Sequence, residues 1–111
     1  MCNKYNGYTN YETWNVSLWI DNDPGLYDII QEMTHTIIDD DPAEPKTSQL
    51  ADQIKDMHEE NAPELQGTYS DLLSAALRSV NWYEIAKNWI ETEDEYRQEL
   101  LEDIDDKHGE E

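Results

Sequence analysis

The chain combines extreme acidity with the aromatic side chains that a folded core needs. Its 111 residues include 27 Asp or Glu against seven Lys or Arg, which gives a formal net charge of −20. Disordered acidic segments are poor in aromatic residues, and they cannot bury enough apolar surface to offset the entropy lost on ordering. This chain instead contains four Trp and seven Tyr. We therefore expect a small folded protein that carries a strong negative field.

Apolar residues recur at intervals of three and four along most of the chain. This spacing indicates amphipathic helices, and no Asn-Gly or Asp-Gly turn stands between alternating runs of the kind that form a hairpin. The predicted fold is all-α, a compact bundle of five or six short helices with an acidic C-terminal helix. Because the length suits one domain, residues 1–111 are predicted to form a single helical domain.

The first helix is predicted to follow a polar lead-in. Residues 1–10 contain a glycine and three asparagines and are expected to be irregular. Asn10 fits an N-cap for a helix that continues to about Asp21. A strand is the alternative for this segment, because apolar residues also occupy alternate positions. These residues are Val16, Leu18 and Ile20.

The second helix is predicted to begin at Asp23 and Pro24. An Asp at the N-cap accepts a free backbone N–H, and Pro at the first helical position lacks the donor that would otherwise be unpaired. This helix should end near Asp39, because Pro42 prevents its continuation. Residues 40–46 are predicted to form a loop.

Two further helices are predicted before the C-terminal third. Thr47 or Ser48 is expected to cap a third helix that ends by Asn61. A fourth helix follows the turn at Gly67 and has the most apolar face of the chain. This face consists of Tyr69, Leu72, Leu73, Ala76, Leu77 and Val80.

The C-terminal third begins with a capping-box pattern in which Asn81 is followed three residues later by Glu84. The segment from Thr92 to Glu95 repeats this pattern. Residues 82–106 therefore form either one long helix or two. Residues 107–111 are predicted to be a frayed tail.

The sequence offers little catalytic or metal-binding chemistry. Its three histidines lack a second His or Cys at ligand spacing, and no phosphate-binding glycine motif, nucleophile elbow or calcium loop is present. We therefore predict a non-enzymatic protein with no cofactor and no metal site. A single cysteine, Cys2, excludes an internal disulfide.

The charge also restricts the partners. Proteins bind nucleic acids and anionic membranes through clustered Lys and Arg, so we expect direct binding to neither. The N-terminus does not resemble a signal peptide, and no apolar run is long enough to cross a membrane. These features predict a cytoplasmic protein whose partner has a basic surface.

Carboxylates form a helical stripe in the C-terminal third. Its members lie three or four residues apart, which places neighbours about 5–6 Å from each other on a helix. They are Glu91, Glu95, Glu99, Glu102 and Asp106. We predict that this stripe binds the partner, with Asp39, Asp40 and Asp41 as outlying charges. Solubility alone does not require such a surface, because a net charge of about 2–8 suffices for a small domain.

Two segments resemble small acidic proteins carried by phages, plasmids and other mobile elements: NGYTNYETWNVSLWIDND at 6–23 and YSDLLSAALRSVNWYEIAKNWIE at 69–91. In length, helical character and acidic C-terminal helix, the whole chain is also similar to phage antirestriction proteins that mimic DNA. It differs from them where Lys107 and His108 interrupt the terminal acidic run. The similarity implies an inhibitor that occupies the DNA-binding channel of a host restriction or CRISPR protein.

An adaptor or regulatory module that binds a protein through exposed Tyr and Trp side chains is the alternative. Tyr5, Tyr8 and Tyr11 are the candidates for surface contact, whereas the four Trp are predicted to lie mainly in the core. An exposed Trp and Tyr patch would also favour a homodimer.

Overall fold

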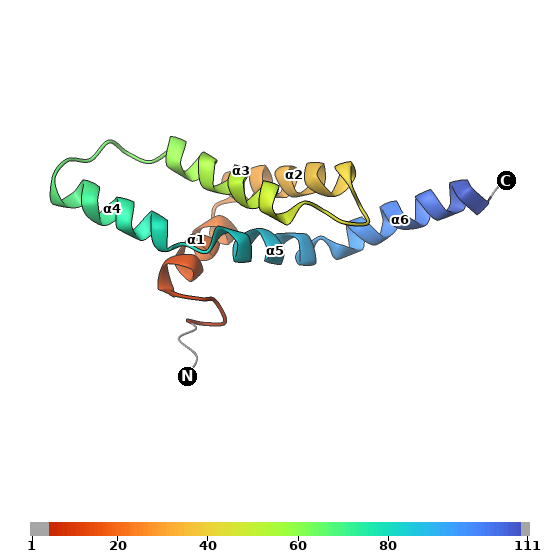
Figure 1. Ribbon diagram of the computed structural model, residues 1–111, viewed down its shortest axis with the longest axis horizontal. Helices are drawn as coiled ribbons and strands as arrows, with labels where there is room; N and C mark the ends of the chain where they lie inside the picture. The colour runs from red at the N-terminus through yellow and green to blue at the C-terminus, as the bar shows by residue number, and fades with distance from the viewer. Residues whose placement is uncertain (1–4, 110–111) are drawn as a thin grey trace.

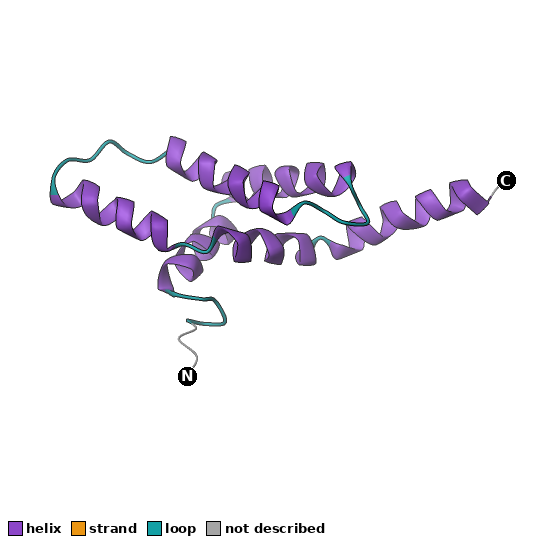
Figure 2. Ribbon diagram, in the orientation of Figure 1, coloured by secondary structure: helices purple, strands orange, loops and turns teal. Residues whose placement is uncertain are grey.

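The computed structural model describes the backbone of residues 5–109 and the side chains of residues 5–103. Within this range the chain forms helices joined by loops and contains no strand (Figure 2). The helices are α1 (Tyr11–Asn22), α2 (Pro24–Asp40), α3 (Thr47–Glu60), α4 (Thr68–Ser79), α5 (Trp82–Thr92) and α6 (Asp94–Gly109). The prediction of an all-α protein is confirmed, and the strand alternative for the first segment is wrong.

Side-chain caps begin three of the helices as predicted. The Asn10 side chain accepts a hydrogen bond from the backbone N–H of Thr13 at 2.9 Å. The Asp23 carboxylate accepts one from Leu26 at 3.2 Å, and the Asn81 side chain accepts one from Glu84. Each cap satisfies a backbone donor that has no partner within the helix.

The start of α3 differs from the prediction. Its N-cap is Lys46, which makes no side-chain capping bond, so neither Thr47 nor Ser48 caps the helix. The Thr47 N–H instead donates to the carbonyl of Pro45 at 2.9 Å. This tight turn after the proline makes Thr47 the first helical residue.

The core is formed where α2, α3 and α5 pack together, with α1 against α2 (Figure 1). Isoleucines and two tryptophans fill it, because the chain contains no Phe. Ile30, Ile54 and Ile85 are almost fully buried, and Trp82 and Trp89 are less than a tenth exposed. The two tryptophans therefore lie in the core, as predicted.

Two helices, α5 and α6, cover residues 82–106, separated by Glu93. Glu93 departs from helical geometry, with φ −93° and ψ 22°. The Thr92 hydroxyl donates to the carbonyl of Asn88 at 2.8 Å, a bond that often bends helices. The backbone of α6 continues to Gly109, three residues into the predicted tail, and residues 110–111 lie outside the described part.

The two outer helices α4 and α6 extend from opposite ends of the core (Figure 1). The molecule consequently measures 64 × 35 × 22 Å, with a radius of gyration of 16.7 Å. A compact domain of about 100 residues has a radius of gyration of about 13 Å. The core is thus a small bundle from which two helical arms project.

The apolar face predicted for the fourth helix is largely open to solvent. No residue of α4 is buried, and the side chains of Tyr69 and Leu72 are 71% and 62% exposed. Leu73 and Leu77 are half-buried, and the following Val80 is buried. Among the described helices, only α1 has a backbone that closely approaches the backbone of α4. The amphipathic pattern is present in the helix, but little of the protein covers it.

Candidate functional site

The predicted stripe lies on the arm formed by α6 and on the end of α5 before it. Glu95, Glu99 and Glu102 on α6 are exposed, as is Glu91 on α5. We call these four residues the acidic row. The break at Glu93 divides it, so Glu91 stands on a different helix from the other three. The side chain of Asp106 lies outside the described residues.

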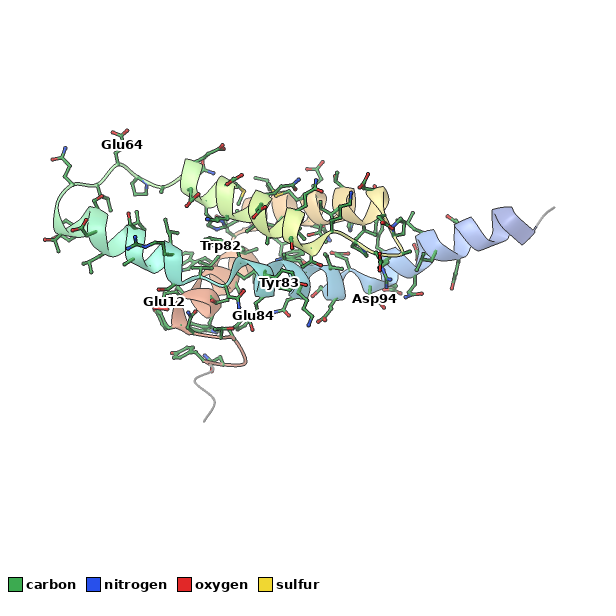
Figure 3. The ribbon with its side chains drawn as sticks, viewed as in Figure 1. Glu12, Glu64, Trp82, Tyr83, Glu84 and Asp94 are labelled. Carbon is green, nitrogen blue, oxygen red and sulfur yellow. The ribbon has the colours of Figure 1, made fainter. Side chains whose placement is uncertain are left out.

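The first ten residues of α6 have a charge density close to that of one DNA strand. Five carboxylates and one guanidinium between Asp94 and Asp103 leave four net negative charges. Ten helical residues span about 15 Å, which gives about one charge per 4 Å of axis. One strand of B-DNA carries a charge about every 3.4 Å. Asp94 marks the base of this helix at its junction with α5 (Figure 3).

Arg97 anchors the base of α6 to the loop between α2 and α3. Its Nε donates to the carbonyl of Pro42 at 2.5 Å, and Nη2 donates to that of Ala43 at 2.9 Å. Successive helical residues are about 100° apart, so Glu95 and Glu99 lie roughly opposite Arg97. The side of α6 that is held against the protein is therefore not the side that carries the acidic row.

Glu93 joins the α5–α6 junction to α2. Its carboxylate accepts a hydrogen bond from Gln31 Nε2 at 2.9 Å and lies 3.1 Å from His35 Nε2. The His35 ring also stacks on Tyr96, with ring centroids 4.0 Å apart and planes 10° from parallel. Because the Glu93 side chain is only 13% exposed, this carboxylate belongs to the packing between helices and not to the acidic row.

Asp39, Asp40 and Asp41 lie beside the base of α6, but each is engaged in a local contact. Asp39 accepts a hydrogen bond from the Tyr96 hydroxyl at 2.5 Å. This bond, with burial and the charge of Asp39, raises the pKa of Tyr96. Asp40 lies 3.6 Å from Lys46 Nζ, and Asp41 accepts from the backbone N–H of Glu44. These three carboxylates brace a loop and a helix junction, and so differ from the unpaired acidic row.

The contact between α2 and α6 is a structural feature that the sequence reasoning missed. Gln31, His35 and Asp39 occur four residues apart on α2, so they share one face of that helix. This spacing was a usable signal for a polar helix contact. Their partners Glu93 and Tyr96 lie 57 to 62 residues away in sequence, and no local pattern identifies them.

The aromatic residues outside the core divide into two groups. Tyr5 and Tyr11 pack edge to face at 5.2 Å, and both rings contact the half-buried Trp14. Tyr8 exchanges two backbone hydrogen bonds with Tyr5, so these tyrosines hold the N-terminal segment on α1. Trp19 is 64% exposed, so the prediction that the tryptophans lie in the core is wrong for this residue.

The described side chains contain no group of three His, Cys, Asp or Glu residues arranged to hold a metal ion. None of the helices in the part of the chain that the structure describes has the length and apolar character needed to span a lipid bilayer.

Comparison with known proteins gives a family but no activity. Residues 1–107 match the family model described as "Family of unknown function (DUF7249)". Neither the curated proteins nor the solved structures include a match to the chain. Because the match covers nearly the whole sequence, the protein belongs to the family of unknown function DUF7249.

Proposed function

We propose that this protein is a non-enzymatic inhibitor from a phage or another mobile element, which mimics the charge of DNA. Its target is a basic, nucleic-acid-binding protein of host defence, such as a restriction or CRISPR effector. The inhibitor acts in the host cytoplasm and binds neither nucleic acid nor membrane itself.

The observation that carries this proposal is the position of the acidic row. Glu95, Glu99 and Glu102 are exposed on a helix that extends beyond the bundle. A projecting helix is able to enter a concave channel that a globular acidic surface cannot enter. The positive lining of a DNA channel would attract the row from a distance, because complementary charges accelerate association.

Repulsion among the carboxylates of the row must be offset for α6 to stay ordered. Like charges three or four residues apart destabilise a helix by about 0.2–0.5 kcal/mol per pair. In α6 the contacts of Arg97 with the loop offset this repulsion at the base of the helix. The carboxylates are held in a fixed order without being neutralised, as a mimic of phosphates requires.

The test is displacement of a labelled DNA duplex from purified restriction and CRISPR effectors, measured at low and high salt. We expect the protein to displace DNA from at least one effector, with an inhibition constant that weakens by about tenfold or more between 50 and 300 mM NaCl. An equally acidic but unstructured peptide is the control. Failure to displace DNA from any effector, or displacement no better than that of the peptide, would contradict the proposal.

A second candidate function rests on α4. Tyr69 and Leu72 are exposed on this helix, and the half-buried Leu73 and Leu77 line an open groove of about 430 Å³. Large exposed apolar surfaces of this kind mark protein-binding sites. An adaptor that used this face, or a homodimer formed through it, would bind with little dependence on salt. The salt series therefore separates the two functions.

A further inference from the structure

A small pocket lies on the flank of the bundle. It measures about 200 Å³ and opens between α1, α2 and α5, and Tyr8 of the N-terminal segment closes one side. Pockets for drug-sized ligands measure about 300–1,000 Å³. This pocket therefore suits a group the size of one side chain and is too small for a nucleotide.

Aromatic rings form two of its walls. Tyr27 and Trp89 meet at an interplanar angle of 62°, with ring centroids 4.9 Å apart, and Tyr8 contributes a third ring. Aromatic faces attract cations, and the planar guanidinium group stacks on them particularly well. The walls thus favour a flat cation over a neutral or anionic group.

Each polar side chain of the lining has an oxygen that can accept a hydrogen bond. Asp21 supplies a carboxylate, Asn88 supplies an amide, and Ser17 and Thr92 supply hydroxyls. The lining includes no Lys, Arg or His side chain. The Thr92 hydroxyl donates a hydrogen bond to the carbonyl of Asn88 at 2.8 Å. A guanidinium group has five N–H donors and no acceptor, so it matches this lining.

Asp21 is an exposed residue, but its carboxylate is partly desolvated where it lines the pocket. Burial raises its pKa above the ordinary aspartate value. A bound cation would stabilise the ionised form of Asp21 and offset the cost of its desolvation.

We propose that this pocket binds a guanidinium group, stacked against Tyr27 and Trp89 and paired with Asp21. The group belongs to an arginine of the basic partner. Only the assignment of the group to an arginine of the partner rests on the proposed function. The pocket chemistry itself applies equally to a free guanidinium compound.

The position of the pocket agrees with this source. Asn88 lines it, and Glu91 of the acidic row lies three residues further along α5. Residues three apart are neighbours on a helix surface. A cationic partner that follows the acidic row along α6 onto α5 would therefore reach the pocket. In this arrangement the acidic row attracts the partner, and the pocket fixes the position of the partner along the row.

The test is a titration of isotope-labelled protein followed by NMR at about 0.3 M NaCl, where the Debye length is only about 5–6 Å. The probes are agmatine, the capped peptide acetyl-Gly-Arg-Gly-amide and its citrulline counterpart. Citrulline keeps the shape of arginine but carries no charge. The variant Asp21→Asn removes the carboxylate, and Asp52→Asn on α3 removes an equal charge at an exposed site.

We expect saturable shifts at the Trp89 indole and the Asn88 amide with the arginine peptide, and none with citrulline. Asp21→Asn should weaken binding by about tenfold, and Asp52→Asn by less than about twofold. Binding of the peptide supports an arginine side chain as the source, whereas binding of agmatine alone supports a free compound in the same site. Diffuse shifts, equal binding of citrulline, or no loss in Asp21→Asn would overturn the proposal. The titration contains no target protein, so a negative result in it is independent of a negative result in the DNA-displacement test.

Discussion

The two arms of the molecule, α4 and α6, project from opposite ends of one core and differ in almost every other respect. The twelve residues of α4 carry a single acidic residue, Asp71, and a single basic residue, Arg78, and expose an apolar face. The first ten residues of α6 carry five carboxylates. One arm is therefore strongly acidic, whereas the other has no net charge.

The arms are also attached in different ways. The C-terminal end of α4 is held through Asn10, whose side chain donates to the carbonyl of Ser79 at 2.6 Å. The base of α6 is held by Arg97, by the Tyr96 bond to Asp39 and by the pair of Glu93 with His35. The acidic arm needs more polar contacts because repulsion among its carboxylates opposes an ordered helix.

The largest effect is expected from a substitution in the core, which both arms share. Ile54 is fully buried between the central helices, and Ile54→Ala should lower the free energy of unfolding by about 2–5 kcal/mol. Urea denaturation followed by circular dichroism would measure it. Loss of helix signal in a single transition would show that the arms depend on the core, whereas a persistent helical fraction would show that one arm folds separately.

Releasing the base of α6 should affect one arm alone. Arg97→Ala removes the hydrogen bonds to the carbonyls of Pro42 and Ala43, and such charge-assisted bonds are worth about 1.5–3 kcal/mol. Hydrogen exchange should accelerate across residues 94–103 and stay unchanged in α4. Arg78→Ala is the matched control, because it removes the same charge from the other arm. Equal acceleration in both variants would refute a specific anchor at Arg97.

High pH should loosen the same junction by a smaller amount. The hydrogen bond to Asp39 raises the pKa of Tyr96, so its contribution is complete below the ordinary tyrosine value of about 10 and is lost as pH rises through the higher folded-state value. The free energy of unfolding should then fall more steeply above pH 10 in the native protein than in Tyr96→Phe. Parallel pH profiles would argue against this role of the bond.

The smallest effect is expected on α4. Leu72 is 62% exposed, so Leu72→Ser should change the free energy of unfolding by no more than about 0.5 kcal/mol. Leu50→Ser in the core, where the side chain is fully buried, is the control and should destabilise severely. A large loss of stability from Leu72→Ser would mean that the apolar face of α4 is covered in solution, for example by a second copy of the chain.

Local chemistry explains which parts of the fold were predictable. The caps at Asn10, Asp23 and Asn81 each depend on a side chain and a backbone donor only three residues apart, so sequence reasoning identified them. The exposure of Glu95 and Glu99 likewise follows from helical spacing alone. Their role as a partner-binding row remains a prediction.

Long-range geometry explains what was missed. The pattern of residues 82–106 fits one helix as well as two, and the break at Glu93 coincides with its contacts to Gln31 and His35 on another helix. The pocket between α1, α2 and α5 brings together Tyr8, Asp21 and Trp89 from three separate segments. The apolar pattern of α4 predicted an amphipathic helix, but a pattern contains no information on what covers its face.

The proposed inhibition depends on the order of carboxylates on α6 and not on the total charge. Two variants with equal net charge test it most directly. Glu95→Gln, Glu99→Gln and Glu102→Gln together neutralise the row, while Asp52→Asn, Asp56→Asn and Glu60→Gln remove three exposed carboxylates from α3. In DNA displacement from a sensitive effector, the α6 variant should be weaker by at least about tenfold and the α3 variant close to the native protein. Equal losses in the two variants would contradict the account.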